Sequence, residues 1–249
     1  MDLKTHVAAS MAAASLMVFA TMTNAAEIKV IASGGLKAAC LDLIPSFERA
    51  SGHKVAAAWA GSVDIKRRME GGESFDLVIM PGAFIDDLIK LGKVIPGSRV
   101  DLAKSGIGVA VRAGAPKPDI SSADALKQAL RSASYSTSAS GIYLAGLFQR
   151  MGIADELKPK IKQSPPGVPV GEMVARGEAE IGFQQVSELL PVAGIAYLGP
   201  LPQEVQHFTV FSAGHHIGSQ QPDGAKALTD FIRSPSAHPV IRKSGMEPA

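Results

Sequence analysis

Short apolar runs that are typical of strands alternate with amphipathic, helix-like segments along nearly the whole sequence. We predict strands over 28–32, 55–59, 76–80, 106–112, 133–136, 180–183, 195–198 and 208–213. We predict helices over 36–51, from 62 onward, and over 84–92, 122–131, 141–151, 170–177 and 224–233. Such alternation is typical of a mostly parallel sheet flanked by helices, so the sequence predicts an α/β protein.

The first 26 residues differ from the rest and are predicted to be a signal peptide. Lys4 precedes a run of small and apolar residues from Val7 to Met22, and small residues around Ala25 suit cleavage by signal peptidase. The apolar run has about 16 residues, fewer than the roughly 20 that span a bilayer, so a membrane anchor is the weaker alternative. We therefore expect a mature, periplasmic protein that starts at Ala26 or Glu27.

The bulk composition excludes some classes of partner. Cys40 is the single cysteine, so no disulfide can form within the chain, and it is expected to be a small core residue of the first helix. The formal net charge is only +2, and the longest basic run is Lys66 to Arg68, so nucleic acid is not indicated. The roughly 223 residues after the signal peptide suffice for one domain or for two lobes.

The C-terminal segment is predicted to form one more helix. Ser234 suits its N-cap and Pro235 its first turn, and the apolar residues continue toward Gly245. Pro239 falls inside this segment and is expected to shorten or kink the helix.

Three predicted strands run into loops of small, glycine or hydroxyl residues, and a helix directly follows each loop. The loops are Ser33-Gly34-Gly35, Ala60-Gly61-Ser62 and Ser138-Ala139-Ser140-Gly141. A helix N-terminus presents unpaired N–H groups and a partial positive charge, and small residues let a ligand oxygen approach them. Three such loops meeting in one cleft would bind a small anion. The alternative is that the serines are ordinary helix caps and that the glycines only form turns.

Arg67 is a further candidate ligand residue, because an arginine near a helix N-terminus can hold a carboxylate with two hydrogen bonds. Its neighbours Lys66 and Arg68 are expected to face solvent. His215 and His216 would point in opposite directions on a strand, and no acidic or cysteine residue stands at metal-ligand spacing beside them. We therefore expect neither a metal nor a cofactor.

No familiar catalytic or nucleotide-binding motif occurs in the sequence. HExxH, GxSxG, GxxxxGK[ST] and a GxGxxG after a strand are all missing. Asp64, Glu172, Glu188 and His207 have the chemistry of an acid or base, but their spacing selects none of them. A solvated surface position is the alternative for all four, so the sequence leaves any catalytic residue unknown.

Several segments resemble the periplasmic molybdate-binding proteins of ABC transporters, within the type II periplasmic binding fold. The resemblance covers essentially the whole mature chain. Its segments are "IKVIASGGLKAACLDLIPSFERASGHKV", "AGSVDIKRRMEGGESFDLVI", "SASGIYLAGLFQRMGI", "ARGEAEIGF" and "AKALTDFIRSPSAHPVIRKSGMEP". The resemblance implies two α/β lobes, 27–107 with 208–249 and 108–207, that hold an anion between them.

The molybdate pattern is changed at individual residues. The hydroxyl that the family places in the first loop falls on Gly35, and the tyrosine expected after "EIGF" is Gln185. Ser62 keeps the second loop's serine, and Ser140 is compatible with a backbone N–H contact. The remaining donors suit a planar carboxylate better than a compact oxyanion, because amide and guanidinium groups match its two oxygens. The candidate ligand residues are Ser33, Gly34, Gly35, Gly61, Ser62, Arg67, Ser140, Gly141, Gln184 and Gln185.

The favoured interpretation is a monomeric solute-binding protein that captures a small anion, preferably an organic carboxylate, for an ABC permease. A sensor-domain partner would have the same sequence features. The alternative comes from a divergent branch of the same family, the aconitate isomerases, which the segment "GFQQVSELLPV" resembles. That branch implies a cofactor-free proton shift between cis- and trans-aconitate, with Glu188 or a histidine as acid and base.

Overall fold

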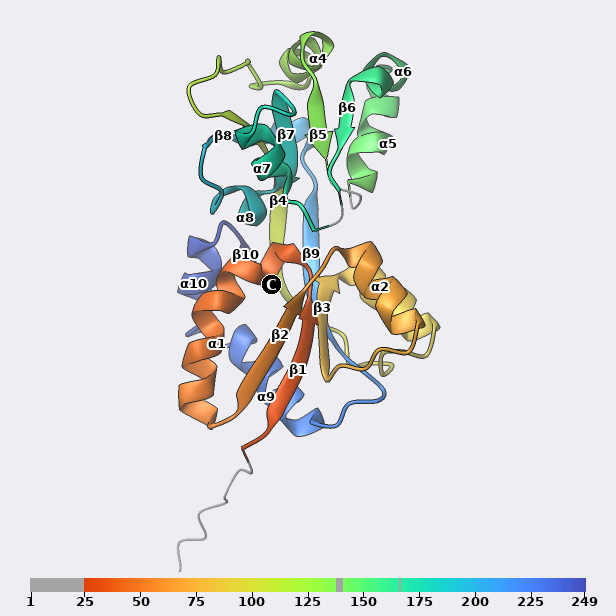
Figure 1. Cartoon of the computed structure of the whole chain (residues 1–249), viewed down its shortest axis with the longest axis vertical. Coiled ribbons are helices and arrows are strands. Elements are labelled where there is room, and N and C mark those ends of the chain that lie inside the picture. Colours follow the sequence, from red (N-terminus) through yellow and green to blue (C-terminus); the bar gives the residue numbers. More distant parts are fainter. Residues whose placement is uncertain (1–24, 138–140, 166) are drawn as a thin grey trace, which may run out of the picture.

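The computed structural model describes residues 25–137, 141–165 and 167–249, which form a mixed α/β protein (Figure 1). The α/β prediction is confirmed. The predicted signal peptide lies almost entirely outside the described residues. Among those residues, no helix has both the length and the apolarity needed to cross a membrane.

The lower part of the molecule in Figure 1, here called sheet region 1, combines three parallel strands with one antiparallel strand. In spatial order its strands are β2 (Lys54–Trp59), β1 (Glu27–Ala32), β3 (Leu77–Pro81) and β9 (Phe208–His215). Its helices are the 3₁₀ turn η1 (Gly34–Leu36), α1 (Lys37–Ser51), α2 (Ser62–Glu70), α3 (Gly82–Lys90), α9 (Pro222–Arg233) and α10 (His238–Lys243).

The upper part, sheet region 2, repeats the arrangement with shorter strands. Strands β5 (Tyr135–Thr137), β6 (Ile161–Gln163) and β7 (Ile181–Gln185) run parallel, and β8 (Ile195–Pro200) pairs with β4. Its helices are α4 (Ala123–Ser132), α5 (Ile142–Arg150), α6 (Ala154–Leu157), α7 (Val170–Ala175) and α8 (Val186–Leu189), with 3₁₀ turns η2 (Lys158–Lys160) and η3 (Gln203–Val205).

The two regions are joined by the long strand β4 (Val100–Arg112), which belongs to both. Its residues up to Gly106 pair with β9, and its residues from Ile107 onward pair with β7 and β8. Strand β10 (Glu247–Pro248) adds to the first part of β4. The sequence predicted only 106–112, because Asp101 and Lys104 interrupt the apolar pattern. Both are satisfied by ion pairs, Asp101 with Arg99 and Lys104 with Glu247.

The buried apolar side chains fall into three clusters that follow the same division. One contains residues from 28–103 and 211–246, a second contains residues from 31–94, and the third contains residues from 107–201. The lobe boundaries remain a prediction; one falls inside β4 and the other immediately before β9.

The final helix begins later than predicted. Ser234 follows the last residue of α9, and α10 starts at His238 with Pro239 in its first turn. A proline there lacks only an N–H that would be unpaired anyway, so Pro239 starts the helix and does not kink it. The pattern also missed β6, because two of its three residues are exposed and polar.

Candidate functional site

The first two predicted loops lie side by side at the carboxyl ends of β1 and β2. These strands are parallel, and Ala32 is level with Trp59, so Ser33 and Ala60 leave the sheet at neighbouring points. In Figure 1 the N-terminal end of α5, where the third loop ends, points down toward this edge. Gly141 caps α5, whereas Ser138, Ala139 and Ser140 lie outside the described residues. The fold thus brings the first two loops, and Gly141 at the start of α5, to the middle of the molecule.

The second loop is not closed by a serine cap. Gly61 is the N-cap of α2, and Ser62 is its first helical residue, 5% exposed. The side chain of Ser62 is therefore buried at the helix N-terminus without serving as its cap. Arg67 is turned away from this end: its side chain is 77% exposed and pairs with Asp64 at 2.7 Å. It lies on the solvent side of α2.

Ser33 supplies a buried hydroxyl in the first loop. Its residue is 4% exposed, its N–H donates to the Ile79 carbonyl oxygen at 2.8 Å, and its Oγ has no partner among the described residues. A buried hydroxyl without a hydrogen bond costs free energy, which a ligand oxygen or an ordered water would recover. The first loop therefore has an unused polar group of the kind that an anion site needs.

Gly35 has no room for a side chain. A Cβ at this position would collide with the ring of Phe211 on β9, which lies across the loop. The hydroxyl expected here by resemblance is therefore excluded by packing, and the loop's hydroxyl is that of Ser33.

Gly35→Ser is expected to destabilise the protein by about 1–3 kcal/mol, because the added atoms overpack the core against Phe211. Urea unfolding measures the change. The double variant Gly35→Ser/Phe211→Leu should recover part of the loss, because the smaller side chain leaves space. If Gly35→Ser alone were as stable as the parent protein, a side chain at position 35 would not clash with Phe211.

Glu188 on α8 meets the first loop from the other side. A Cβ on Gly34 would meet the end of the Glu188 side chain, so the carboxyl of region 2 lies directly against this glycine of region 1. Helix α8 packs on η1 and α1, so the half-buried Glu188 lies at the junction of the two sheet regions. Burial raises the pKa of Glu188 to about 7, although the nearby Gln184 side chain partly opposes the rise. Near neutral pH this carboxyl is present both with and without its proton.

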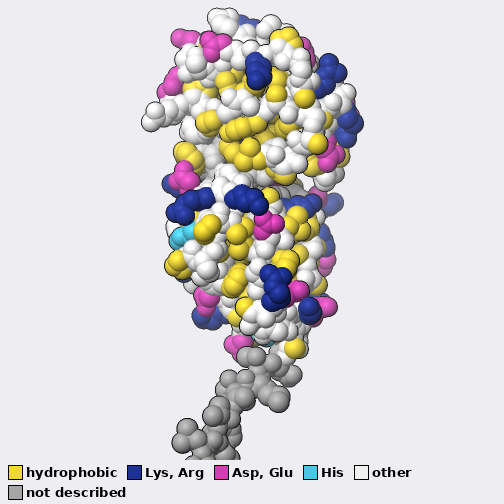
Figure 2. All heavy atoms as spheres, turned by 90° about the vertical axis from the view of Figure 1, so that its left-hand side faces the viewer, with side chains coloured by type: hydrophobic (Ala, Val, Ile, Leu, Met, Phe, Trp, Pro, Cys, Tyr) yellow, Lys and Arg dark blue, Asp and Glu magenta, His cyan; other side chains and the backbone are white. Residues whose placement is uncertain are grey.

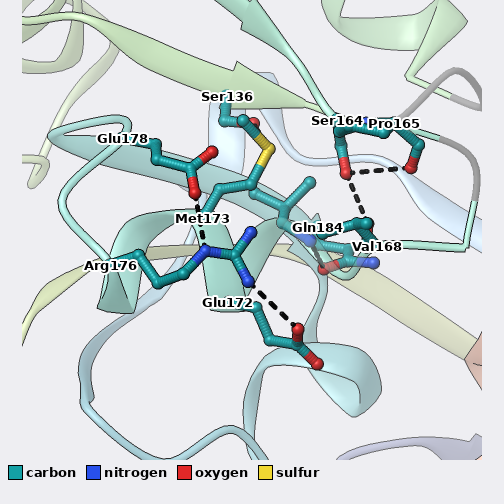
Figure 3. Close-up of polar contacts among 10 residues, drawn as sticks. Ser136, Ser164, Pro165, Val168, Glu172, Met173, Arg176, Glu178 and Gln184 are labelled. Carbon is teal, nitrogen blue, oxygen red and sulfur yellow. Dashed lines mark hydrogen bonds and ion pairs between the residues drawn. The ribbon is translucent and has the colours of Figure 1, made fainter.

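The adjacent glutamines have different roles. Gln184 is 9% exposed, and its Oε1 accepts a hydrogen bond from the Val170 N–H at 3.0 Å (Figure 3). The Nε2 of Gln185 donates to the Thr209 hydroxyl at 3.0 Å, while its buried Oε1 has no partner in the part of the chain that the structure describes. Gln185 therefore offers a free oxygen at the crossing of β7, β4 and β9, whereas the oxygen of Gln184 is engaged by Val170.

The other acid or base candidates are engaged elsewhere. Asp64 pairs with Arg67, Glu172 pairs with Arg176 at 3.5 Å, and the ring of His207 stacks on Tyr143 at 4.4 Å. No group of three metal-ligating side chains occurs in the part of the chain that the structure describes. Glu188 is thus the candidate whose surroundings suit proton transfer. One local feature points to it, because Glu188 is a lone acid between the apolar residues of "VSELL" directly after a buried strand.

The surface at the junction is basic on one face. Figure 2 shows Lys and Arg side chains gathered where the molecule narrows between the two sheet regions, on the side that carries α1, α8 and α10. Arg242 and Lys243 occupy the last turn of α10 on this side. A positive field there would attract an anionic ligand toward the junction.

Two sheet regions joined by crossing strands, with helix N-terminal loops at the junction, define the architecture of a periplasmic binding protein. The chain belongs to the bacterial extracellular solute-binding proteins, whose family model matches residues 28–247. It is 40% identical over 252 residues to the aconitate isomerase of a Pseudomonas species, covering 96% of both chains. It is also 26% identical to a molybdate-binding protein of Azotobacter vinelandii, covering 91% of this chain and 92% of the other.

The fold agrees with a solved relative. The structure superposes on the periplasmic molybdate-binding protein of Azotobacter vinelandii with a TM-score of 0.73 and 20% identity, covering 88% of this chain and 98% of that one. The predicted resemblance to molybdate-binding proteins and the predicted fold are confirmed.

Proposed function

We propose that the protein is an isomerase that moves a proton within an unsaturated tricarboxylate, interconverting cis- and trans-aconitate without a cofactor. The observation that carries the proposal is the Glu188 carboxyl, placed against the first loop with a pKa raised by burial to about 7. The 40% identity to an aconitate isomerase over 96% of both chains supports it. The interpretation favoured from sequence alone, a transport receptor, becomes the second candidate.

The reaction needs a single base that later acts as an acid. Ionised Glu188 takes a proton from the methylene carbon of aconitate, and the electron pair moves through the double bond toward the neighbouring carboxylate. The protonated carboxyl then returns a proton to the formerly vinylic carbon, so the double bond has shifted by one position. An acid whose pKa lies near the working pH suits both half-steps, because each protonation state is readily reached.

The loops would hold the substrate carboxylates. The N–H groups at the start of the η1–α1 and α2 segments, the free Ser33 hydroxyl and the free amide oxygen of Gln185 are the polar groups at the junction. N–H and hydroxyl donors aimed at a carboxylate would stabilise the negative charge that builds up on it when the proton leaves. A protonated carboxyl or a bound water would satisfy the Gln185 oxygen.

The test is to incubate the purified mature protein with cis-aconitate in D₂O and to follow the products by proton NMR. We expect trans-aconitate to accumulate, with deuterium at the carbon that receives the proton. Failure to form the trans isomer under conditions where calorimetry shows aconitate binding would overturn the enzyme proposal.

The second candidate is a solute receptor, and membership of the solute-binding family favours it. In that case the mature protein is exported to the periplasm and passes a carboxylate or oxyanion to a permease. A thermal-shift series with molybdate, sulfate and di- and tricarboxylates separates the ligands, because binding to the folded state raises the melting temperature. A response to molybdate alone would contradict both carboxylate proposals.

A further inference from the structure

Lys37 is the first residue of α1 and directly follows the first loop. Its N–H donates to the Gly34 carbonyl oxygen and closes the η1 turn, so its backbone is fixed beside that loop. Long side chains on a helix lean toward the helix N-terminus. In Figure 1 this end of α1 faces sheet region 2. The exposed side chain of Lys37 therefore lies at the edge of region 1 where the loops are.

The indole ring of Trp59 positions the Lys37 ammonium near the second loop. Trp59 is the last residue of β2, packs against the core of region 1, and is level with Ala32 on β1. The Nζ of Lys37 lies 6.0 Å from the centre of this ring, at the outer limit of a cation–π contact. The ammonium is thus placed beside the point where β1 and β2 pass into the first two loops.

The positive charge of Lys37 is not neutralised by the protein itself. The three cations of α2, which are Lys66, Arg67 and Arg68, each pair with a carboxylate. By contrast, none of the ion pairs among the described residues involves Lys37. An uncompensated cation beside the loops is available to an anionic ligand.

We propose that Lys37 receives one carboxylate of the ligand and makes the site prefer tricarboxylates over dicarboxylates. The inference rests on the proposed function, because it assigns a residue to the third carboxylate of aconitate. The helix N–H groups and the Ser33 hydroxyl are neutral donors. Hydrogen bonds between two charged partners are roughly twice as strong as neutral ones, so a third carboxylate gains most beside the ammonium.

The experiment measures binding by calorimetry with two saturated acids that cannot be isomerised. Tricarballylate has the three carboxylates of aconitate, and methylsuccinate lacks one of them. The parent protein should bind tricarballylate more tightly. Lys37→Met should weaken tricarballylate binding by about 10- to 100-fold and methylsuccinate binding by less than about threefold, because only the third carboxylate loses its partner. Lys37→Arg keeps the charge and should bind tricarballylate within about threefold of the parent.

Lys243→Met is the matched control. It removes the same charge from the basic face of the junction, but the Lys243 ammonium already pairs with Asp42 at 3.7 Å. At about 0.15 M salt, exposed charges more than about 8 Å apart are largely screened. The affinity for either acid should therefore change by less than about twofold.

Three results would overturn the inference. They are a parent protein that does not prefer tricarballylate, an equal loss of both acids in Lys37→Met, and an equal loss in Lys37→Met and Lys243→Met. An equal loss would mean that Lys37 acts only through the general positive field. Because neither acid can react, these measurements decide the role of Lys37 with or without turnover. Failure of the isomerase proposal is seen separately, as an absence of trans-aconitate from a protein that binds aconitate.

Discussion

Glu188→Gln is expected to reduce the conversion of cis- to trans-aconitate by about 10²- to 10⁴-fold, the usual contribution of a general acid and base. Glutamine has nearly the same shape but cannot take up a proton. The parent activity should rise with pH through the pKa of Glu188, about 7, because the first half-step needs the ionised carboxyl. Initial rates between pH 5 and pH 9 measure both effects.

The same variant should gain stability. The folded-state pKa of Glu188 is raised from 4.5 to about 7, so the folded protein binds a proton that the unfolded chain has released. The contribution of Glu188 to the stability of the folded protein is therefore most favourable below pH 4.5, and it is lost as the pH rises through 7. At pH 8 the buried charge costs roughly 2–3 kcal/mol, which Glu188→Gln removes. Urea unfolding at pH 5 and pH 8 should show the gain only at the higher pH.

Glu172→Gln is the matched control, because Glu172 lies on neighbouring α7 and pairs with Arg176 on the surface. It should change the turnover less than about twofold, and its unfolding free energy by less than about 1 kcal/mol. If Glu188→Gln kept the parent activity, Glu188 would not be the base. If both variants lost activity equally, the loss would not be specific to proton transfer.

Asp76→Ala should destabilise the protein by about 3–5 kcal/mol, because it leaves several buried donors without an acceptor. Asp76 is 3% exposed and accepts hydrogen bonds from the Lys29, Gln220 and Gln221 N–H groups and from the Ser219 hydroxyl. These bonds fasten the segment before α9 to β1 at the end of region 1 opposite the loops. The loss should appear in the midpoint of urea unfolding and leave ligand affinity unchanged.

The contribution of Asp76 should depend on pH. Burial alone would raise its pKa, but the four hydrogen bonds together hold the pKa below its usual value. The stability it gives is thus present above the pKa of an unfolded aspartate and is lost as pH falls through the lower folded value. Asp230→Ala, which removes an exposed pair with Lys226, is the control and should cost less than about 1 kcal/mol. A similar cost for both variants would contradict the role of Asp76.

Much of this protein followed from local patterns in the sequence. The alternating apolar runs predicted the order of strands and helices, and the small residues after β1 and β2 located the two loops that lie side by side at the junction. Such features depend only on residues within a few positions of each other, because backbone geometry sets the spacing of apolar residues in a strand or a helix. The resemblance to molybdate-binding proteins also rested on local segments, and it was sufficient to name the family.

The tertiary structure decided what the junction can do. Glu188 approaches Gly34, and Phe211 fills the space beside Gly35, through contacts between residues more than 150 positions apart. The apolar neighbours of Glu188 in the sequence are compatible with a sheltered side chain but do not require one; its pKa is raised because the fold buries its carboxyl against the first loop. Likewise, Arg67 was a candidate because it lies close in sequence to the N-terminus of α2. In the structure it is on the face of α2 that points to solvent. Burial depends on which surfaces meet across the fold, so the proton-transfer candidate emerged only when both regions were in place.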